Sequence, residues 1–179
     1  MHHANGHAVR SAPTGREVTF GTDEIIVSKT DLNGRITYAN DVFLRVAGYD
    51  EDEVLDKPHS FIRHPDMPRC VFKLLWDSIQ SGREIFAYVV NLTKSGDHYW
   101  VFAHVTPSFD ANGRVSGFHS NRRCPDGAQV ARVRTLYSAL VAEEKKHTRK
   151  VDAIEASTQL LERTIAETHA SYDEFVFSI

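Results

Sequence analysis

The chain is poor in several residue types, and each shortage excludes a class of protein. Its 179 residues include two cysteines, Cys70 and Cys124, which match neither a Cys-x-x-Cys redox motif nor the spacing of a zinc site. No apolar run approaches the roughly 18 residues of a transmembrane helix, and the N-terminus lacks the apolar segment of a signal peptide. We therefore expect a cytoplasmic protein whose two thiols are buried or idle.

Positive charge is also in short supply. The 21 Lys and Arg residues are outnumbered by 24 Asp and Glu, which gives a formal net charge of −3. Proteins that bind nucleic acid or acidic membranes carry a basic patch, so we expect neither partner here. With 41% apolar and 25% charged residues, the chain has the composition of a globular protein, and its length allows one domain plus an appendage.

Catalytic motifs are missing as well. There is no nucleophile motif built on Ser or Cys, no Gly-rich phosphate loop, no His-Glu-x-x-His and no kinase ATP signature. His147 follows two lysines on a helix pattern, but its neighbours do not match the box of a phospho-accepting histidine. We therefore expect a protein that binds and signals rather than an enzyme, and no metal site.

The sequence does contain a regular order of strand and helix patterns. β-Rich residues at 24–30 and 35–39 flank Asn33-Gly34, a dipeptide that favours a tight hairpin. Short helix patterns follow between residues 40 and 55, and 71–79 repeats apolar residues at helical spacing. The remaining strand patterns, separated by short Gly-bearing turns, are 85–93, 98–109 and 114–122.

This order predicts an α+β fold, in which five strands form one antiparallel sheet and the short helices lie across one face. A pocket is expected between the helices and the sheet. Within 98–105, large apolar residues occupy both faces of the alternating pattern. The pattern therefore leaves open which face meets the helices, and a second copy or the C-terminal helix is expected to cover the other.

The stretch Phe61-Ile62-Arg63-His64-Pro65-Asp66-Met67-Pro68 is the most unusual part of the sequence. It places a guanidinium, an imidazole and a carboxylate within four residues, on a connector stiffened by two prolines. Such a group is a candidate ligand site. The same residues also suit a helix N-terminus, with Asp66 as the cap and Pro68 at an early helical position, and both interpretations can hold.

The two ends of the chain differ from its middle. Residues 1–22 have no apolar period, which predicts a flexible arm. Residues 126–171 predict one long, coiled-coil-like helix with apolar residues at heptad spacing. Glu144 and His147 interrupt this seam, so we expect it to be weak at its middle, where the helix bends, loosens or pairs. The apolar residues of 172–179 predict a tail that docks on a partner or folds back.

The element order, together with the segments Asp31–Asn40 and Asn91–Trp100, resembles a PAS sensor domain over residues 23–125. Within that superfamily, Ile62–Pro68 and Gly96–Trp100 are similar to the aerotaxis-receptor subgroup, whose PAS domain holds FAD without a covalent bond and reports its redox state. The resemblance implies a five-stranded antiparallel sheet with flanking helices. It also implies a redox or oxygen sensor that passes a change at its cofactor into the C-terminal helix.

The resemblance further implies which residues meet the cofactor. An arginine fork can donate to a diphosphate or a flavin carbonyl, and an asparagine amide can both donate and accept at the ring edge. Tryptophan side chains are candidate aromatic walls. The predicted cofactor-binding residues are Arg63, His64, Asp66, Asn40, Asn91, Trp76 and Trp100.

The chain departs from this subgroup at Ile85-Phe86, where flavin-holding relatives carry a tryptophan shortly after the turn that follows the long helix. The departure removes a stacking partner and keeps haem open as an alternative cofactor. Its axial ligand would come from His59, His64, His98, His104 or His119. A flavin–cysteine adduct is not expected, because the Asn-Cys-Arg-Phe core of that photoreceptor branch is absent.

A third interpretation is a PAS adaptor with an empty pocket, which dimerises and docks on a chemoreceptor or a kinase. For the sensor and for the adaptor we expect a homodimer, and a chemoreceptor or a histidine kinase as the signalling partner.

Overall fold

A computed structural model of the protein describes residues 11–168 and 171–179. The strands are β1 (Ile26–Thr30), β2 (Ile36–Ala39), β3 (Ile85–Leu92), β4 (His98–Phe109) and β5 (Val115–Arg123). The helices are α1 (Asp41–Ala47), α2 (Glu51–Val54), the 3-10 helix η1 (His59–Ile62), α3 (Arg69–Gln80), α4 (Gly127–Glu144), α5 (Lys150–Ala166) and α6 (Tyr172–Ser178). The strands form one antiparallel sheet in the order β2-β1-β5-β4-β3, which confirms the predicted five-stranded α+β fold.

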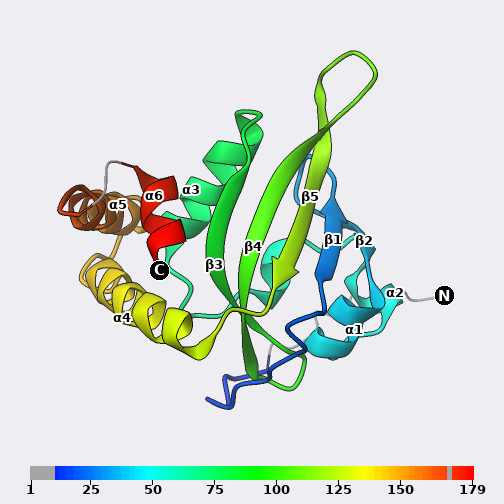
Figure 1. The fold of residues 1–179 in the computed structure, drawn as a ribbon, viewed down its shortest axis with the longest axis horizontal. Helices are drawn as coiled ribbons and strands as arrows, with labels where there is room; N and C mark the ends of the chain where they lie inside the picture. Colours follow the sequence, from blue (N-terminus) through cyan, green and yellow to red (C-terminus); the bar gives the residue numbers. More distant parts are fainter. Residues whose placement is uncertain (1–10, 169–170) are drawn as a thin grey trace.

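The helices gather toward the two edges of the sheet (Figure 1). Helices α1 and α2 contact β1 and β2, whereas α6 contacts the opposite edge strand, β3, with α4 and α5 beside it. Helix α3 contacts both β3 and β4. None of the described helices is long and apolar enough to cross a membrane.

The inner face of the sheet, which meets α1 to α3, carries the main core. Phe43 of α1 and Ile36 of β2 are fully buried there, and burial of such a side chain contributes roughly 1.5–3 kcal/mol. The residues of β4 on this face are Tyr99, Val101, Ala103 and Val105. The sequence left open which face meets the helices, and the structure answers that question.

The outer face of β3 and β4 is covered too. Trp100 of β4 and Tyr88 of β3 pack in a second core with residues of α4 such as Tyr137 and Leu140. The Tyr137 hydroxyl donates to the Tyr88 carbonyl at 2.6 Å. Both faces of β4 are therefore buried, which is why both faces of its alternating pattern are apolar.

The C-terminal part is a helical hairpin instead of the one long helix expected over 126–171. Helix α4 ends at Glu144 and α5 begins at Lys150, so the break falls where the heptad seam is interrupted. Leu140 and Leu161, 0% and 4% exposed, pack in the outer core. The seam is thus buried within one chain, because a short connection lets the two helices lie side by side.

The C-terminal tail of residues 172–179 folds back, which was one of its two predicted outcomes. It forms α6, whose Val176 is 2% exposed in the outer core. The Phe177 ring lies 4.7 Å from the Phe86 ring of β3. Phe86 is one of the two residues at which the chain departs from the aerotaxis-receptor subgroup. Its side chain therefore faces the outer side of the sheet.

Residues 11–20 do not form the free arm that the sequence predicts. The backbone N–H of His98 donates to the carbonyl of Arg16 at 2.9 Å, so this segment runs beside the start of β4. The Arg16 guanidinium also donates to the Asp97 carboxylate, with 3.0 Å between Nε and Oδ2. The sequence pattern does not reveal this pairing, because backbone hydrogen bonds form without regularly spaced apolar residues. The rest of the predicted arm, residues 1–10, lies outside the described residues.

Candidate functional site

The connector Arg63–Met67 begins along the edge of β3. An isolated antiparallel bridge joins Arg63 to Asn91, and the His64 N–H donates to the Val90 carbonyl at 3.3 Å. Consecutive side chains of an extended segment point to opposite faces. As a result, Arg63 lines a cavity on the inner face of the sheet, whereas His64 lines one on the outer face.

The first of these, which we call the inner cavity, has a volume of about 70 Å³ and lies between α3 and the inner face of the sheet. Three of the predicted cofactor residues meet here: Arg63 from the connector, Trp76 from α3 and Asn91 from β3. Other residues that line it include Thr30, His59, Phe72, Val89, Phe118 and Arg122.

Part of the inner cavity's lining is polar and lacks partners. Thr30 Oγ1 and Arg122 Nη1 are buried and make no hydrogen bond with the part of the chain that the structure describes, and the buried Asn91 amide has the Tyr99 hydroxyl beside it. Leaving a buried polar group unpaired costs about 1–3 kcal/mol, so folded proteins rarely do it without a reason. Two donors and a hydroxyl at one cavity suit a ligand that carries hydrogen-bond acceptors.

The buried Arg122 and the half-buried His59 form a pair beside these atoms. Arg122 is 3% exposed, and its Nη2 donates to His59 Nε2 at 2.8 Å. Burial, together with the neighbouring charge of Arg122, lowers the pKa of His59 to about 3. Burial also lowers the pKa of Arg122, to about 10, which still leaves it protonated at neutral pH. The pair therefore carries one positive charge, and it resides on Arg122.

Aromatic rings form another part of the inner cavity's lining. Trp76 lies edge-on to Phe118, with ring centroids 5.5 Å apart and an interplanar angle of 89°, and 6.3 Å from Phe72. A Cβ on Gly34, which has φ +76° in the turn between β1 and β2, would lie 2.6 Å from the Trp76 ring. The positive φ and this close approach both favour glycine at position 34, so the turn packs directly against the indole.

The volume of the inner cavity limits what enters without movement. Pockets for drug-sized ligands occupy roughly 300–1,000 Å³, well above the 70 Å³ found here. A planar three-ring ligand therefore requires side chains to give way. Phe72 and Trp76 are only partly buried, unlike the fully packed strand residues opposite, so they are the side chains that can move outward.

Three other predicted residues lie at a second cavity, of about 620 Å³, on the outer face. It is lined by His64, Asp66 and Trp100 together with residues of α4. His64 Nδ1 accepts a hydrogen bond from the Asp66 N–H at 3.0 Å, and the Asp66 carboxylate is largely exposed. The structure therefore separates His64, Asp66 and Trp100 from the inner cavity by the thickness of the sheet.

Asn40 lies at neither cavity. Its side chain caps α1 by accepting from the Phe43 N–H at 3.0 Å, and it also accepts from the Val27 N–H and donates to the Ile25 carbonyl. All of these partners belong to the fold, so the asparagine ties α1 to the start of β1.

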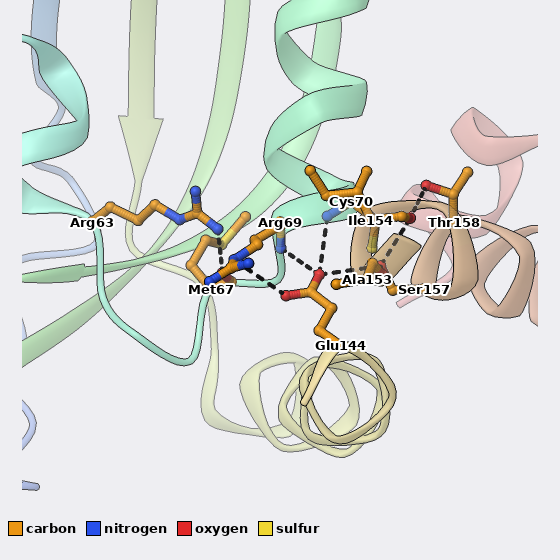
Figure 2. A network of polar contacts seen from close by, with 9 residues as sticks. All are labelled: Arg63, Met67, Arg69, Cys70, Glu144, Ala153, Ile154, Ser157 and Thr158. Atoms are coloured by element: carbon orange, nitrogen blue, oxygen red, sulfur yellow. Dashed lines mark hydrogen bonds and ion pairs between the residues drawn. The ribbon is translucent and has the colours of Figure 1, made fainter. Parts of the chain in front are cut away.

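The N-terminus of α3 is capped by another part of the chain (Figure 2). Its N-cap residue is Pro68, and the expected cap, Asp66, makes no such bond. Instead, Glu144 Oε1 from the end of α4 accepts from the N–H groups of Arg69 at 2.6 Å and Cys70 at 3.2 Å. The carboxylate also suits the positive end of the helix dipole. The proline side chain has no hydrogen-bond acceptor, so Pro68 cannot cap these N–H groups, and the Asp66 carboxylate points to solvent.

Glu144 has a further contact, to α5. The Ser157 hydroxyl donates to Glu144 Oε1 at 3.1 Å. On the other side of the capped turn, Arg63 Nη2 donates to the Met67 carbonyl at 2.8 Å. Polar contacts therefore join Arg63 to Met67 and, two residues further along the backbone, join Arg69 and Cys70 through Glu144 to the C-terminal hairpin (Figure 2).

Sequence reasoning did not identify Arg122 and Thr30 as site residues, and it considered His59 only as a haem ligand. A signal for Arg122 exists in the alternation of β5, which puts Phe118, Ser120 and Arg122 on one face. A charged residue on a face with buried neighbours is a candidate for function. Its pairing with the fully buried Ile26 of β1 becomes visible only in the folded sheet.

Comparisons with known proteins identify relatives that share this fold. The PAS fold family matches residues 36–122. The chain is 39% identical over 129 residues to the aerotaxis receptor of Escherichia coli (strain K12), covering 72% of this chain and 25% of that receptor. It is 31% identical over 83 residues to phototropin-1A of Oryza sativa subsp. japonica, covering 46% of this chain and 9% of that protein.

A further relative is a blue-light-activated histidine kinase of Brucella canis (strain ATCC 23365 / NCTC 10854 / RM-666), 27% identical over 111 residues. That match covers 62% of this chain and 23% of the kinase, so the chain spans about a quarter or less of each of these relatives.

Among solved structures, a light-oxygen-voltage domain from a study of a flavin analogue has a TM-score of 0.57 at 18% identity. The similarity covers 62% of this chain and 84% of that domain, and it shows a shared fold.

Proposed function

Residues 36–122 of the chain form a PAS domain, and from this premise we propose that the protein is a sensor whose inner cavity holds a flavin. One observation carries the proposal. Arg122 and Thr30, which have unpartnered buried polar atoms, and the buried amide of Asn91 line the same cavity as the aromatic rings of Phe72 and Trp76. A flavin ring is planar, with acceptors along one edge, and needs both kinds of surface.

The side chains have separate roles in this proposal. A bound flavin supplies a ring that takes up and releases electrons. Arg122 and Asn91 donate to its acceptor edge, and Trp76 packs on it. Arg63, whose guanidinium lies 4.6 Å from the Phe72 ring centroid, closes the cavity on the connector side. His64, Asp66, Trp100 and Asn40 have other surroundings and are not part of this site.

We further propose that the flavin is FAD and that the signal is redox state or oxygen. The support is the similarity to the aerotaxis receptor over 72% of the chain. Residues 23–125 are proposed as the sensor and 126–179 as the output region, which acts on a chemoreceptor or a histidine kinase as a cytoplasmic homodimer. The polar contacts through Glu144 offer a physical route between the two regions.

Haem fits the inner cavity less well than flavin. Among the described residues that line it, His59 is the one histidine, and its Nε2 accepts a hydrogen bond from Arg122. An iron ligand would have to replace that bond beside a fixed positive charge. The other candidate histidines belong to the outer side of the sheet, as His64 does.

The test of the flavin proposal is an absorption spectrum of the purified protein, before and after reconstitution with FAD, FMN or haemin. We expect flavin bands in the wild type. Asn91→Leu is expected to weaken flavin binding at least tenfold, because a lost buried hydrogen bond costs about 1–3 kcal/mol. Asn121→Leu is the matched control, since Asn121 is exposed on β5 of the same sheet.

The small volume of the inner cavity favours a second candidate function, a PAS adaptor without a ligand. The same spectra separate the two. A folded protein that stays colourless and takes up neither flavin nor haemin supports the adaptor and contradicts the sensor.

A further inference from the structure

Arg122 is a guanidinium in the lining of the inner cavity without a carboxylate beside it. Its Nε donates to Ser120 Oγ at 2.9 Å, and its Nη2 contacts Ser28 Oγ as well as His59. The ring centroid of Phe43 lies 5.5 Å away. These partners are neutral, and within the described ranges none of the ion pairs involves Arg122.

A buried charge of this kind needs a counter-charge. Removing an ion from water costs several kcal/mol, and neutral hydroxyls and an aromatic face return only part of that. His59 cannot serve, because an imidazole is either neutral or positively charged. Arg122, which lines the cavity, therefore lacks a counter-charge and also lacks a hydrogen-bond partner for its Nη1.

From this geometry we infer that Arg122 makes the inner cavity selective for negative charge on its ligand, and therefore favours the reduced flavin over the oxidised one. This inference rests on the proposed function. An oxidised flavin ring is neutral. One electron from an external reductant such as dithionite, taken up without a proton, leaves one negative charge on the ring, and Arg122 supplies the matching positive charge.

The competing explanation is structural. Arg122 joins β1, β5 and η1 through Ser28, Ser120 and His59, so the residue can also serve the fold alone. A structural role depends on the hydrogen bonds. The proposed role depends on the charge, and two variants separate these properties: Arg122→Gln keeps hydrogen-bonding groups without charge, and Arg122→Lys keeps the charge without the fork.

The experiment measures the midpoint potential of bound FAD in the full chain, together with affinity for oxidised FAD. Arg122→Gln is expected to weaken binding of the reduced form at least tenfold more than that of the oxidised form. For one electron, this shifts the midpoint by at least about 59 mV to more negative values. In Arg122→Lys, the ratio of the affinities for reduced and oxidised FAD is expected to differ from the wild-type ratio by less than threefold.

Arg123→Gln is the matched control. It removes the same charge from the next position of β5, where the side chain is exposed, and is expected to leave the midpoint unchanged. If Arg122→Gln and Arg123→Gln shift the midpoint equally, or not at all, the inference is overturned while the flavin sensor stands. If the wild type takes up no flavin, the proposed function fails, and the inference fails with it.

A measurement on the wild type covers the case in which Arg122→Gln does not fold. Because no proton accompanies the electron, the midpoint is expected to stay constant between pH 6 and 8. A slope of about −59 mV per pH unit means one proton per electron. That slope contradicts the inference, since the ring would then carry no net charge for Arg122 to match.

Discussion

Single residues decide the chemistry of the inner cavity, and they come from distant parts of the chain. Ser28 of β1, His59 of η1 and Arg122 of β5 meet in one polar cluster. The imidazole stays neutral because burial and, to a smaller extent, the neighbouring guanidinium lower its pKa. This cluster makes a prediction about the stability of the protein.

We predict that His59 makes the folded protein less stable as the pH is lowered. Its pKa of about 3 in the folded protein lies below the unfolded value of about 6.5, so between these values the unfolded chain binds the extra proton. The free energy of unfolding therefore decreases as pH falls through this window, by up to about 1.4 kcal/mol per unit. Urea titrations at pH 7 and pH 5 measure this change.

His59→Gln is the comparison for that measurement, because it keeps an acceptor for Arg122 without a titrating group. The wild type is expected to lose about 2 kcal/mol more than the variant between pH 7 and pH 5. The carboxylates with lowered pKa values, such as Glu24 and Asp97, titrate below this range. Identical pH dependence in the two proteins contradicts the prediction.

At the scale of elements, α3 depends on a cap from elsewhere in the chain. It follows Pro68, which has no capping side chain, and Glu144 of α4 supplies the missing acceptor. The same carboxylate holds Ser157 of α5. An element that lines the inner cavity is thus fixed at its first turn by the C-terminal hairpin.

We predict that Glu144→Ala lowers the free energy of unfolding by about 3 kcal/mol, because the N–H groups of Arg69 and Cys70 lose their acceptor. Glu144→Gln keeps an acceptor oxygen and loses only the charge near the helix dipole, so about 1 kcal/mol is expected. Hydrogen exchange at the amides of Arg69 and Cys70 should become faster in the Ala variant. Glu155→Ala, on the exposed side of α5, is the control.

At the scale of the whole molecule, the sheet separates two cores. The inner core packs α1 to α3 on one face, and the outer core packs α4 to α6, together with Cys70 and Val71 at the start of α3, on β3 and β4 (Figure 1). Four residues of the predicted heptad seam, Val133, Tyr137, Leu140 and Leu161, are buried in the outer core of a single chain. A homodimer stays a prediction, and it needs surfaces other than these residues.

We predict that the outer core opens separately from the inner one. Val176→Asp places a carboxylate at a position that is 2% exposed, so α6 should detach and leave the face around Phe86 uncovered. The amides of α6 should lose hydrogen-exchange protection, while the unfolding transition of the sheet shifts by less than about 1 kcal/mol. Val151→Asp, at a position that is 66% exposed, is the control. Complete unfolding of the Val176 variant contradicts this.

Local patterns predicted the elements well. Asn33-Gly34 forms the hairpin turn, Asn40 caps α1 and Gly48 ends it in the left-handed region, as each residue type favours. The break between α4 and α5 also falls at the interrupted seam. These features depend on interactions within a few residues, so they can be read from the chain itself.

The site was predicted only in part. The sequence placed Arg63 and His64 together because they are neighbours, but extended backbone sends their side chains to opposite faces of the sheet. Of the predicted residues, Arg63, Trp76 and Asn91 line the inner cavity. Arg122 lines it too, but the sequence analysis did not predict it. The resemblance to the aerotaxis-receptor subgroup indicated a pocket, but it did not indicate the face of the sheet toward which each side chain points.

The sequence by itself determined the element order, the PAS fold and the motif that borders the ligand cavity, because periodicity, caps and turns act locally. Only the tertiary structure decided what the motif does. It joined Arg122 to His59 across strands, gave α3 a cap from Glu144, and turned the expected long helix into a cover for the sheet. These outcomes follow from burial and pairing between residues distant in sequence, which no local pattern contains.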